Sequence, residues 1–503
     1  MRQHLRTALV SACFALATMA AGVPVPAAAA PRDDVTIGMG IEPAGLDPTI
    51  AAPAAIGQVV WQNVFEGLTR IDESGAVRPQ LAREWTVSPD GRTVTFRLVE
   101  GAIFHNGAAF DSATAKFSLD RARGEASTNP QKQFFTGIES IETPDPATLV
   151  LQLKAPSGNL LTWLGWPASV MVEPGSAETN RAQPVGTGPF RFAEWRQGDR
   201  VRLVRSETYW DKSAAPVLAS ATFRFITDPQ AQAAAMRAGD VDAFPEFGTP
   251  ELFAAFETDG RFAAVAGNTE LKVVAGLNER RKPFDDPRVR RALMMAIDRQ
   301  ALVDAAWGGY GTPIGSHYTP NGPGFRDLTG VAPYDPDAAK TLLAEAGYPD
   351  GFTMTIRSPQ MAYATRSAEI LQGFLAEIGV TLIIVPTEFP AVWVDQVLKG
   401  HDFDMTIVAH AEPMDIGIYA RPDYYFGYRN PEFDALIAQA EASVDEARRL
   451  SLYGEAQARL AQDLPALYLF VMPKLGLWDK RLDGLWHDEP IPSNDLTDVR
   501  WRE

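Results

Sequence analysis

The segment Ala409 to Tyr428, AHAEPMDIGIYARPDYYFGY, carries the side chains best suited to chemistry. His410, Glu412 and Asp415 offer imidazole nitrogen and carboxylate oxygen, the donors of metal centres and of acid–base pairs. The following DYYFGY is aromatic, and such rings either stack on a ligand or pack a core. The segment therefore indicates a catalytic centre, a metal site or the wall of a binding pocket, and the rest of the chain has to decide.

Motifs of several enzyme classes are missing from the chain. No lysine follows a glycine, so the phosphate-binding loop ending in Gly-Lys-Ser/Thr cannot occur, and neither GxSxG nor HExxH is present. Gly186-Thr187-Gly188 lacks the third glycine of a dinucleotide site. Other histidines stand far apart in sequence, without ligand spacing: His105, His317, His401 and His487. We therefore expect no enzyme, no catalytic residues and no cofactor, although folding can assemble a triad from distant residues.

A metal site in the segment Ala409 to Tyr428, called the 409–428 segment below, is the less favoured interpretation. His410, Glu412 and Asp415 offer one nitrogen and two carboxylates, and no second histidine is near in sequence. We expect no bound metal. The expectation fails if nickel or zinc stays with the protein through dialysis, or if a chelator changes its melting temperature.

The first thirty residues are typical of a secretory signal peptide. Arg2 and Arg6 precede an apolar run from Ala8 to Val23, and Ala27 to Ala30 supply small residues for cleavage. Cys13, the only cysteine, ends a Val-Ser-Ala-Cys sequence similar to a lipoprotein cleavage box, but the apolar run before it is too short. We therefore expect export to the periplasm, no lipid anchor, and a mature chain without disulfides.

The composition is that of a globular protein with an acidic balance. The 503 residues are 46% hydrophobic and 22% charged, with a formal net charge of -17. A strongly acidic chain is repelled by phosphate backbones, so nucleic acid is excluded as an expected partner. No stretch after the first thirty residues is apolar for long enough to predict a membrane span.

Strand and helix patterns alternate, which favours an α/β protein. TVTFRLV from Thr93 and TLVLQLK from Thr148 alternate as half-buried strands do. In the second half, three Asp-Pro or Asn-Pro pairs predict helix starts, because the first residue caps and proline fits the first turn: Asp286-Pro287, Asp335-Pro336 and Asn430-Pro431.

A helix-to-strand unit follows in the second half. An amphipathic pattern over residues 362–378 leads through Gly379 into an apolar strand over residues 380–385. This order predicts parallel strand pairing in that part of the chain.

Several segments together resemble one family, the extracytoplasmic solute-binding proteins of ABC importers, peptide/nickel type (solute-binding protein family 5). The resemblance covers nearly the whole chain after residue 30, and the ordered set is more specific than any one motif. In chain order the segments are GLDP from Gly45, VFEGLTR, EWTVSPDGRTVTFRLVEGAIFHNGAAFDSATAKFSLDRA from Glu84, PVGTGPFRFAEWRQGDRVRLVRSETYW from Pro184, GDVDAF, RKPFDDPRVRRALMMAIDRQALV from Arg281, AKTLLAEAGYPDGF, EILQGFLAEIGV and RNPEFDALI.

The resemblance implies an α/β fold of two lobes, a periplasmic-binding-protein clamshell of type II with an extra subdomain in the first lobe. Its implied boundaries are residues 31–271 for the first lobe, 272–471 for the second, and 472–503 for a C-terminal return to the first. A ligand that touches both lobes favours the closed state and shifts the population towards it.

The implied function is the substrate-binding component of an ABC importer. It captures a peptide or peptide-like solute and delivers it to permease subunits in the membrane. The absence of nucleotide motifs agrees with this, since the ATPase is another chain. We expect a monomer.

The resemblance also assigns candidate ligand-binding residues. Peptide-type members use an arginine for the ligand carboxylate, and this position falls on Arg357. They use a tryptophan and an acid in a segment that falls on residues 409–415, where His410 replaces the tryptophan. Ala411 lies in this wall, and either Glu412 or Asp415 supplies the acid. The departure weakens the expectation of an ordinary dipeptide ligand.

Four weaker candidates complete the set. Trp393 lies between the two segments, and Trp163, with Trp166 close by, could face the cleft from the first lobe; core packing competes in each case. Glu42 and Asn63 lie in segments that approach the cleft in this family. DYYFGY is expected to pack the second lobe.

Three alternatives stay open at this point. An exported hydrolase with a cleft active site predicts turnover that is lost in His410→Ala or Asp415→Asn. A metal-chelate (nickel-type) binding protein predicts metal retention. A receptor or chaperone-like module on the same fold predicts that no permease genes lie beside this one.

Overall fold

The computed structural model describes residues 32–51, 54–412 and 414–502. The chain from Asp33 onward forms one compact unit. The predicted signal peptide, residues 1–30, lies outside the described residues. Within the described ranges, no helix combines the length and the apolar character needed to cross a membrane.

An eleven-stranded mixed sheet runs through the compact unit. Its order is β15-β14-β16-β12-β17-β11-β1-β10-β9-β8, and β13 pairs with β17. The strands are β1 Asp34–Met39, β8 Phe190–Arg196, β9 Arg200–Arg205, β10 Ser220–Phe225, β11 Ala243–Phe244, β12 Phe262–Leu277, β13 Thr312–Pro313, β14 Thr353–Pro359, β15 Thr381–Thr387, β16 Met405–His410 and β17 Ala466–Asp479.

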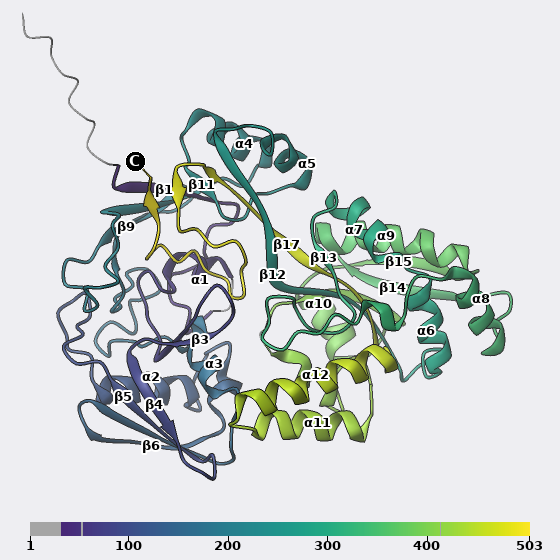
Figure 1. Ribbon diagram of the computed structural model, residues 1–503, viewed down its shortest axis with the longest axis horizontal. Coiled ribbons are helices and arrows are strands. Elements are labelled where there is room, and N and C mark those ends of the chain that lie inside the picture. Colours follow the sequence, from purple (N-terminus) through teal and green to yellow (C-terminus); the bar gives the residue numbers. More distant parts are fainter. Residues whose placement is uncertain (1–31, 52–53, 413, 503) are drawn as a thin grey trace, which may run out of the picture. The chain divides into compact units, whose positions relative to one another are not determined.

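The long strands β12 and β17 connect the two ends of this sheet and run side by side (Figure 1). Their antiparallel pairing is interrupted between Asn268 and Lys272, so the three residues between them leave the ladder. The Thr269 hydroxyl instead donates to the Met472 carbonyl at 2.9 Å. A break of this kind re-aims side chains, and here it frees Glu270 from the sheet pattern.

The elements before β12, α1–α5 and β1–β11, are called the N-terminal elements below. They include a separate antiparallel sheet of order β4-β5-β7-β6. Two of its strands, β5 and β7, confirm the alternating patterns at Thr93 and Thr148. The bounds are α1 Ala54–Val60, α2 Ser112–Arg123, α3 Leu160–Leu164, α4 Pro229–Ala238, α5 Pro250–Phe253, β2 Thr69–Ile71, β3 Val77–Pro79, β4 Ala82–Val87, β5 Thr93–Leu98, β6 Ile138–Asp145 and β7 Thr148–Leu153.

The elements α6–α12 and β13–β16 are called the C-terminal elements. All three predicted helix starts are confirmed, because Asp286, Asp335 and Asn430 accept hydrogen bonds from first-turn N–H groups. The predicted parallel pairing is confirmed for β14 and β15, which α9 connects. The helices are α6 Pro287–Met295, α7 Arg299–Trp307, α8 Pro336–Glu345, α9 Ala362–Glu377, α10 Ala391–Trp393, α11 Pro431–Ala442 and α12 Glu446–Asp463.

The predicted lobe boundaries at residues 271 and 471 fall inside β12 and β17 and stay a prediction. The last residues of β17 pair with β11, and the chain after β17 forms the short strands β18 Leu482–Asp483 and β19 Arg500–Trp501. Both connections between the two sets of elements are therefore strands of one sheet.

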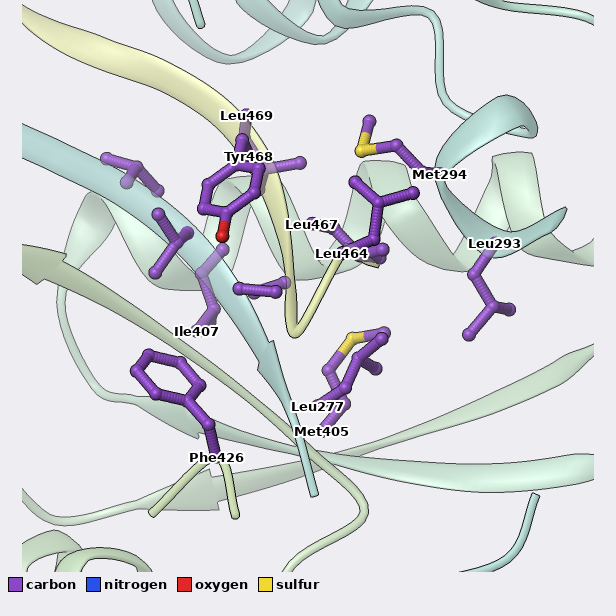
Figure 2. Close-up of a cluster of buried hydrophobic side chains, with 14 of the residues drawn as sticks. Leu277, Leu293, Met294, Met405, Ile407, Phe426, Leu464, Leu467, Tyr468 and Leu469 are labelled. Carbon is purple, nitrogen blue, oxygen red and sulfur yellow. The ribbon is translucent and has the colours of Figure 1, made fainter. Parts of the chain in front are cut away.

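The core of the C-terminal elements packs around β12, β16 and β17 (Figure 2). Leu277, Ile407 and Tyr468 from the three strands are fully buried there. The aromatic segment DYYFGY packs against the same core, with Tyr425 and Phe426 at 0% and 1% exposed. This confirms that the segment packs the fold.

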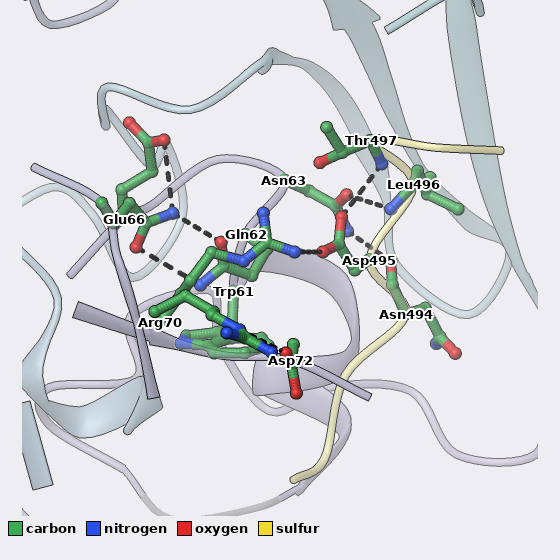
Figure 3. A network of polar contacts seen from close by, with 12 residues as sticks. Trp61, Gln62, Asn63, Glu66, Arg70, Asp72, Asn494, Asp495, Leu496 and Thr497 are labelled. Carbon is green, nitrogen blue, oxygen red and sulfur yellow. Dashed lines mark hydrogen bonds and ion pairs between the residues drawn. The ribbon is translucent and has the colours of Figure 1, made fainter. Parts of the chain in front are cut away.

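A polar network ties the C-terminal segment to the N-terminal elements (Figure 3). The Asn63 side chain donates to the carbonyl groups of Val59 and Asn494 and accepts from the Leu496 N–H, at 3.1, 2.8 and 3.1 Å. Arg70 forms an ion pair with Asp495 at 2.9 Å. Asn63 is fully buried, so all of its hydrogen-bonding capacity serves the fold.

Replacing Asn63 by alanine is expected to lower the free energy of unfolding by about 2–4 kcal/mol, because it leaves the Leu496 N–H and the Asn494 carbonyl buried without partners. Urea unfolding measures the change. Lys340→Ala, at an exposed position, is the control and should change stability by less than about 0.5 kcal/mol. A similarly small loss for Asn63→Ala would show that water replaces the amide.

Candidate ligand cavity between the two sets of elements

A cavity of about 660 Å³, called the large cavity below, lies at the break between β12 and β17. The N-terminal elements contribute the segment after β1 and residues 166–168. The C-terminal elements contribute Trp307, at the end of α7, and residues 411–412, after β16. Its volume is within the range of small-molecule sites, and walls from both sets of elements allow a ligand to link them.

Four carboxyl groups line the large cavity. Glu246 and Glu412 are exposed, whereas Glu270 and Glu489 are only 7% and 4% exposed. Among the described residues that line it, none is lysine, arginine or histidine. The cavity is therefore suited to a positively charged group.

Burial controls the ionisation of these acids. Removal from water raises the pKa of Glu270 to about 8 and raises the pKa of Glu246, Glu412 and Glu489 above the usual glutamate range. Glu246 is exposed towards the cavity, but protein atoms surround it closely enough to have this effect. A cation that enters the cavity would favour the ionised carboxylates.

Lys474 on β17 is a buried lysine whose charge interacts with Glu489 and Glu246. It is 2% exposed, and its Nζ donates to the Trp486 carbonyl at 2.6 Å. Burial lowers the pKa of Lys474, while the charges of Glu489 and Glu246 oppose that effect. The charge of Lys272, also buried, opposes the effect of burial on the pKa of Glu270 and Glu412, so two buried lysines face four carboxyl groups.

A second cavity of about 300 Å³, called the small cavity below, shares Glu270 with the large one. Its N-terminal wall is formed by residues 74–76 of the β2–β3 connection, by Val77 at the start of β3, and by Asn159 and Thr162 around α3. Its C-terminal wall includes Lys272, residues 317–319 and 321–323, and Arg449 of α12. The two cavities therefore meet at Glu270, which lines both.

Lys272 fixes the segment that contributes to both cavities. Its Nζ lies 3.1 Å from Asp415 Oδ1 and donates to the Glu412 carbonyl at 3.0 Å. Glu412 lines the large cavity and Asp415 the small one. Because Lys272 is 3% exposed, this ion pair is almost fully removed from water.

Folding brings His317 close to the 409–428 segment, which the spacing of these residues in the sequence did not predict. His317 Nε2 lies 3.0 Å from Asp415 Oδ2, and His410 Nδ1 lies 3.6 Å from the same oxygen. Burial lowers the pKa of both histidines, that of His410 to about 3, so His410 is neutral at neutral pH. Burial alone would raise the pKa of Asp415, but His317 and Lys272 outweigh it and lower the pKa.

These three side chains, His317, His410 and Asp415, hold their donor atoms within 4.8 Å of one another. They are the described residues that could hold a metal ion, and Glu412 is not in the group. Lys272, however, already supplies the positive charge beside Asp415. The cluster is thus a charge-balanced buried network as it stands.

The other predicted site residues line neither cavity. Arg357 forms an ion pair with Asp402 at 2.8 Å and donates to Gln396 at 2.7 Å. Trp393 is buried and its indole donates to Thr406 at 2.9 Å. Trp163 stacks on Phe134, and Glu42 accepts from Trp195 at 2.9 Å. With Asn63, they contact protein groups, and their role towards a ligand stays a prediction.

The sequence did not indicate several of the residues that line the large cavity. Glu246, Glu270 and Glu489 had no motif, and Trp307 was only part of a predicted helix. Trp166, and not its neighbour Trp163, lines the large cavity. The available signal was Glu270's place beside the predicted lobe boundary at residue 271, since interlobe strands pass close to a ligand.

A family model for bacterial extracellular solute-binding proteins, family 5 Middle, matches residues 76–428. The chain belongs to this family. It is 31% identical over 496 residues to the glutathione-binding protein GsiB of Pectobacterium atrosepticum, with 93% of this chain and 95% of the relative covered. The family resemblance found in the sequence is confirmed.

Solved structures agree on the fold of this solute-binding protein. HbpA2 from Haemophilus parasuis matches with a TM-score of 0.84 and 23% identity, covering 93% of this chain and 100% of that one. AgaA in complex with agropinic acid, from A. tumefaciens R10, matches with a TM-score of 0.76 and 26% identity over 93% and 99%. The predicted fold class, a two-lobed α/β periplasmic binding protein, is confirmed.

Family membership also bears on the open alternatives. The relatives are solute-binding proteins, which favours solute binding over the hydrolase and the chaperone-like module. The buried lysine beside Asp415 gives no support to a metal-chelate site.

Proposed function

We propose that this protein is the substrate-binding component of an ABC importer and captures a peptide-like solute that carries a free, positively charged amine. The observation that carries the proposal is the large cavity, with four carboxyl groups and no cationic side chain among its described lining residues. A desolvated ammonium group needs such partners. The relatives named glutathione-binding proteins fit this class, since glutathione is a tripeptide with a free amine.

Glu412 is the proposed primary partner of the amine. It is exposed and lines the large cavity, and Lys272 donates to its backbone carbonyl. Glu270 and Glu489 lie in the buried wall of the same cavity, and an entering cation would favour their ionised forms. Of the two acids left open by the sequence, Asp415 is occupied by Lys272 and His317, so we assign the ligand contact to Glu412.

The same proposal includes the cellular compartment, the partner subunits and the oligomeric state of the protein. The protein works in the periplasm, delivers its solute to permease subunits and acts as a monomer. The apparent signal peptide and the family support export, and the acidic charge supports the absence of nucleic-acid partners.

The test compares Ala-Leu with N-acetyl-Ala-Leu by isothermal titration calorimetry. Acetylation removes the positive charge, and we expect it to weaken binding by about tenfold to a hundredfold, as for the loss of one charge-assisted hydrogen bond. Glu412→Gln should reduce the affinity for Ala-Leu by a similar factor and leave that for N-acetyl-Ala-Leu unchanged. Glu432→Gln, on an exposed face of α11, is the control. Equal binding of both peptides would contradict amine recognition.

A further inference from the structure

A pair of hydrogen bonds outside the large sheet joins the N-terminal elements to the C-terminal elements. The Gly158 N–H, just before α3, donates to the Glu441 carbonyl in the last turn of α11 at 2.6 Å. The Asn159 amide donates to Tyr453 Oη of α12, also at 2.6 Å. Asn159 and Tyr453 are 3% and 1% exposed, so water is excluded from the second bond. These four residues are called the outer contact below.

The outer contact depends on glycine at position 158. A Cβ atom added to Gly158 would overlap the Ser443 carbonyl oxygen and would lie 2.8 Å from Arg449 Cδ. The φ angle of Gly158 is not positive, so its own backbone would accept a side chain. The close approach of the two sets of elements is therefore the reason for a glycine here. Any larger residue would hold α3 away from the connection between α11 and α12.

The outer contact lies apart from the strands that connect the two sets of elements. β12 and β17 make both connections, whereas the outer contact joins the start of α3 to α11 and α12, and Figure 1 shows α3 beside α12. Hinge motions are absorbed by a few connecting residues. A rotation that bends β12 and β17 would therefore separate Gly158 from Glu441 while the pairing of the two strands persists.

The outer contact is also separate from the candidate solute site. None of its four residues is among the described residues that line the large cavity, and only Asn159 lines the small one. Arg366 and Glu251 also join the two sets of elements, but their ion pair is 40% and 62% exposed. Exposed ion pairs contribute little to stability. The buried outer contact is therefore the stronger of these two ties.

We propose that the outer contact is a latch that positions the two sets of elements for solute binding. It forms when they close, breaks when they open, and raises the affinity for the solute without touching it. This rests on the proposed function, in which the solute binds between the two sets. The latch makes the closed state more populated before the solute arrives. The apparent dissociation constant falls in proportion to that population, by the same factor for every solute that the closed state holds.

Gly158→Ala tests the latch by calorimetry with Ala-Leu and N-acetyl-Ala-Leu. We expect the affinity for both peptides to fall by a common factor of about tenfold, because the added methyl group prevents the backbone hydrogen bond and the close approach. The number of binding sites per molecule should stay that of the wild type, whereas misfolding would reduce it. Gly137→Ala is the matched control, since a Cβ atom there would meet no atom within 4 Å and its φ is not positive either.

Tyr453→Phe tests the same latch without adding an atom. The phenylalanine ring keeps the packing of Tyr453 in the core, but the Asn159 amide loses its acceptor in the closed state. In the open state water satisfies that amide, so the variant favours opening. We expect both affinities to fall by a common factor of about threefold to tenfold. Combined with Gly158→Ala, the effect should be smaller than the product of the two single effects, because the latch is already broken.

Three outcomes would overturn the latch. Unchanged affinities in Gly158→Ala would do so while the proposed amine site stands. A loss confined to Ala-Leu would show that the variant disturbs the amine site itself. If neither peptide binds the wild type, the proposed function falls, and small-angle X-ray scattering of the solute-free proteins decides on the latch. We expect a larger radius of gyration for Gly158→Ala than for the wild type and Gly137→Ala, and equal radii would overturn it.

Discussion

Lys272→Met is expected to lower the free energy of unfolding by about 3–5 kcal/mol, because it leaves the Asp415 carboxylate buried without its cation. Lys272 also donates to the Glu412 carbonyl, so the loss should be accompanied by weaker binding of Ala-Leu. Urea unfolding gives the stability, and calorimetry gives the affinity.

The double variant Lys272→Met with Asp415→Asn is the control for this result. Removing both charges avoids an uncompensated buried ion, and the asparagine oxygen still accepts from His317. We expect it to be more stable than Lys272→Met alone. If the double variant loses at least as much stability, the effect comes from packing of the lysine stem and not from the buried charge.

Glu270→Gln is expected to act in opposite directions on binding and on stability. The side chain keeps its shape but loses its charge, so the affinity for Ala-Leu should fall by about tenfold to a hundredfold. Glu270 Oε2 has no hydrogen-bond partner in the protein, so no internal contact of that atom is lost. A buried charge that binds a ligand commonly lowers the stability of the ligand-free protein.

The stability effect should depend on pH with a definite sign. Burial raises the pKa of Glu270 from 4.5 to about 8, so between these values the folded chain keeps a proton that the unfolded chain releases. Wild-type stability therefore falls as pH rises through this window, relative to Glu270→Gln. At pH 9 the variant should be more stable by about 1–3 kcal/mol, and at pH 4 the two should be nearly equal.

Urea unfolding at pH 4, 7 and 9 measures this difference. The difference between wild type and variant reports the titration of Glu270 together with its coupling to Glu246 and Glu489, because, besides burial, Glu246 raises the pKa of Glu270 and Glu270 raises the pKa of Glu489. A variant that is less stable than the wild type at pH 9 would mean that the carboxylate has a stabilising internal partner when the site is empty.

Local features of this fold were predictable because their causes are local. The caps at Asp286, Asp335 and Asn430 need only the first turn of the helix that follows them. The strands at Thr93 and Thr148 follow from alternation along a few residues. The ordered motifs placed the chain in its family, which a match over residues 76–428 confirms.

One part of the prediction for the 409–428 segment is confirmed, namely the packing of its aromatic residues. Its aromatic half packs the core, as expected, since Tyr425 and Phe426 are buried. Its two acidic side chains lie in different places: Glu412 lines the large cavity, and Asp415 belongs to a buried network with Lys272. The residue spacing could not distinguish the two acids, because a short turn sends neighbouring side chains to different compartments.

The sequence alone determined the family and the α/β class, whereas the cleft wall over residues 409–415 stays a prediction. Only the tertiary structure brought Glu246, Glu270, Glu412 and Glu489 together around one cavity and His317 to Asp415. Those residues come from segments far apart in the chain, and their meeting depends on where the β12–β17 pairing breaks. The break, the burial it creates and the charge left unbalanced are properties of packing, which no local pattern of residues records.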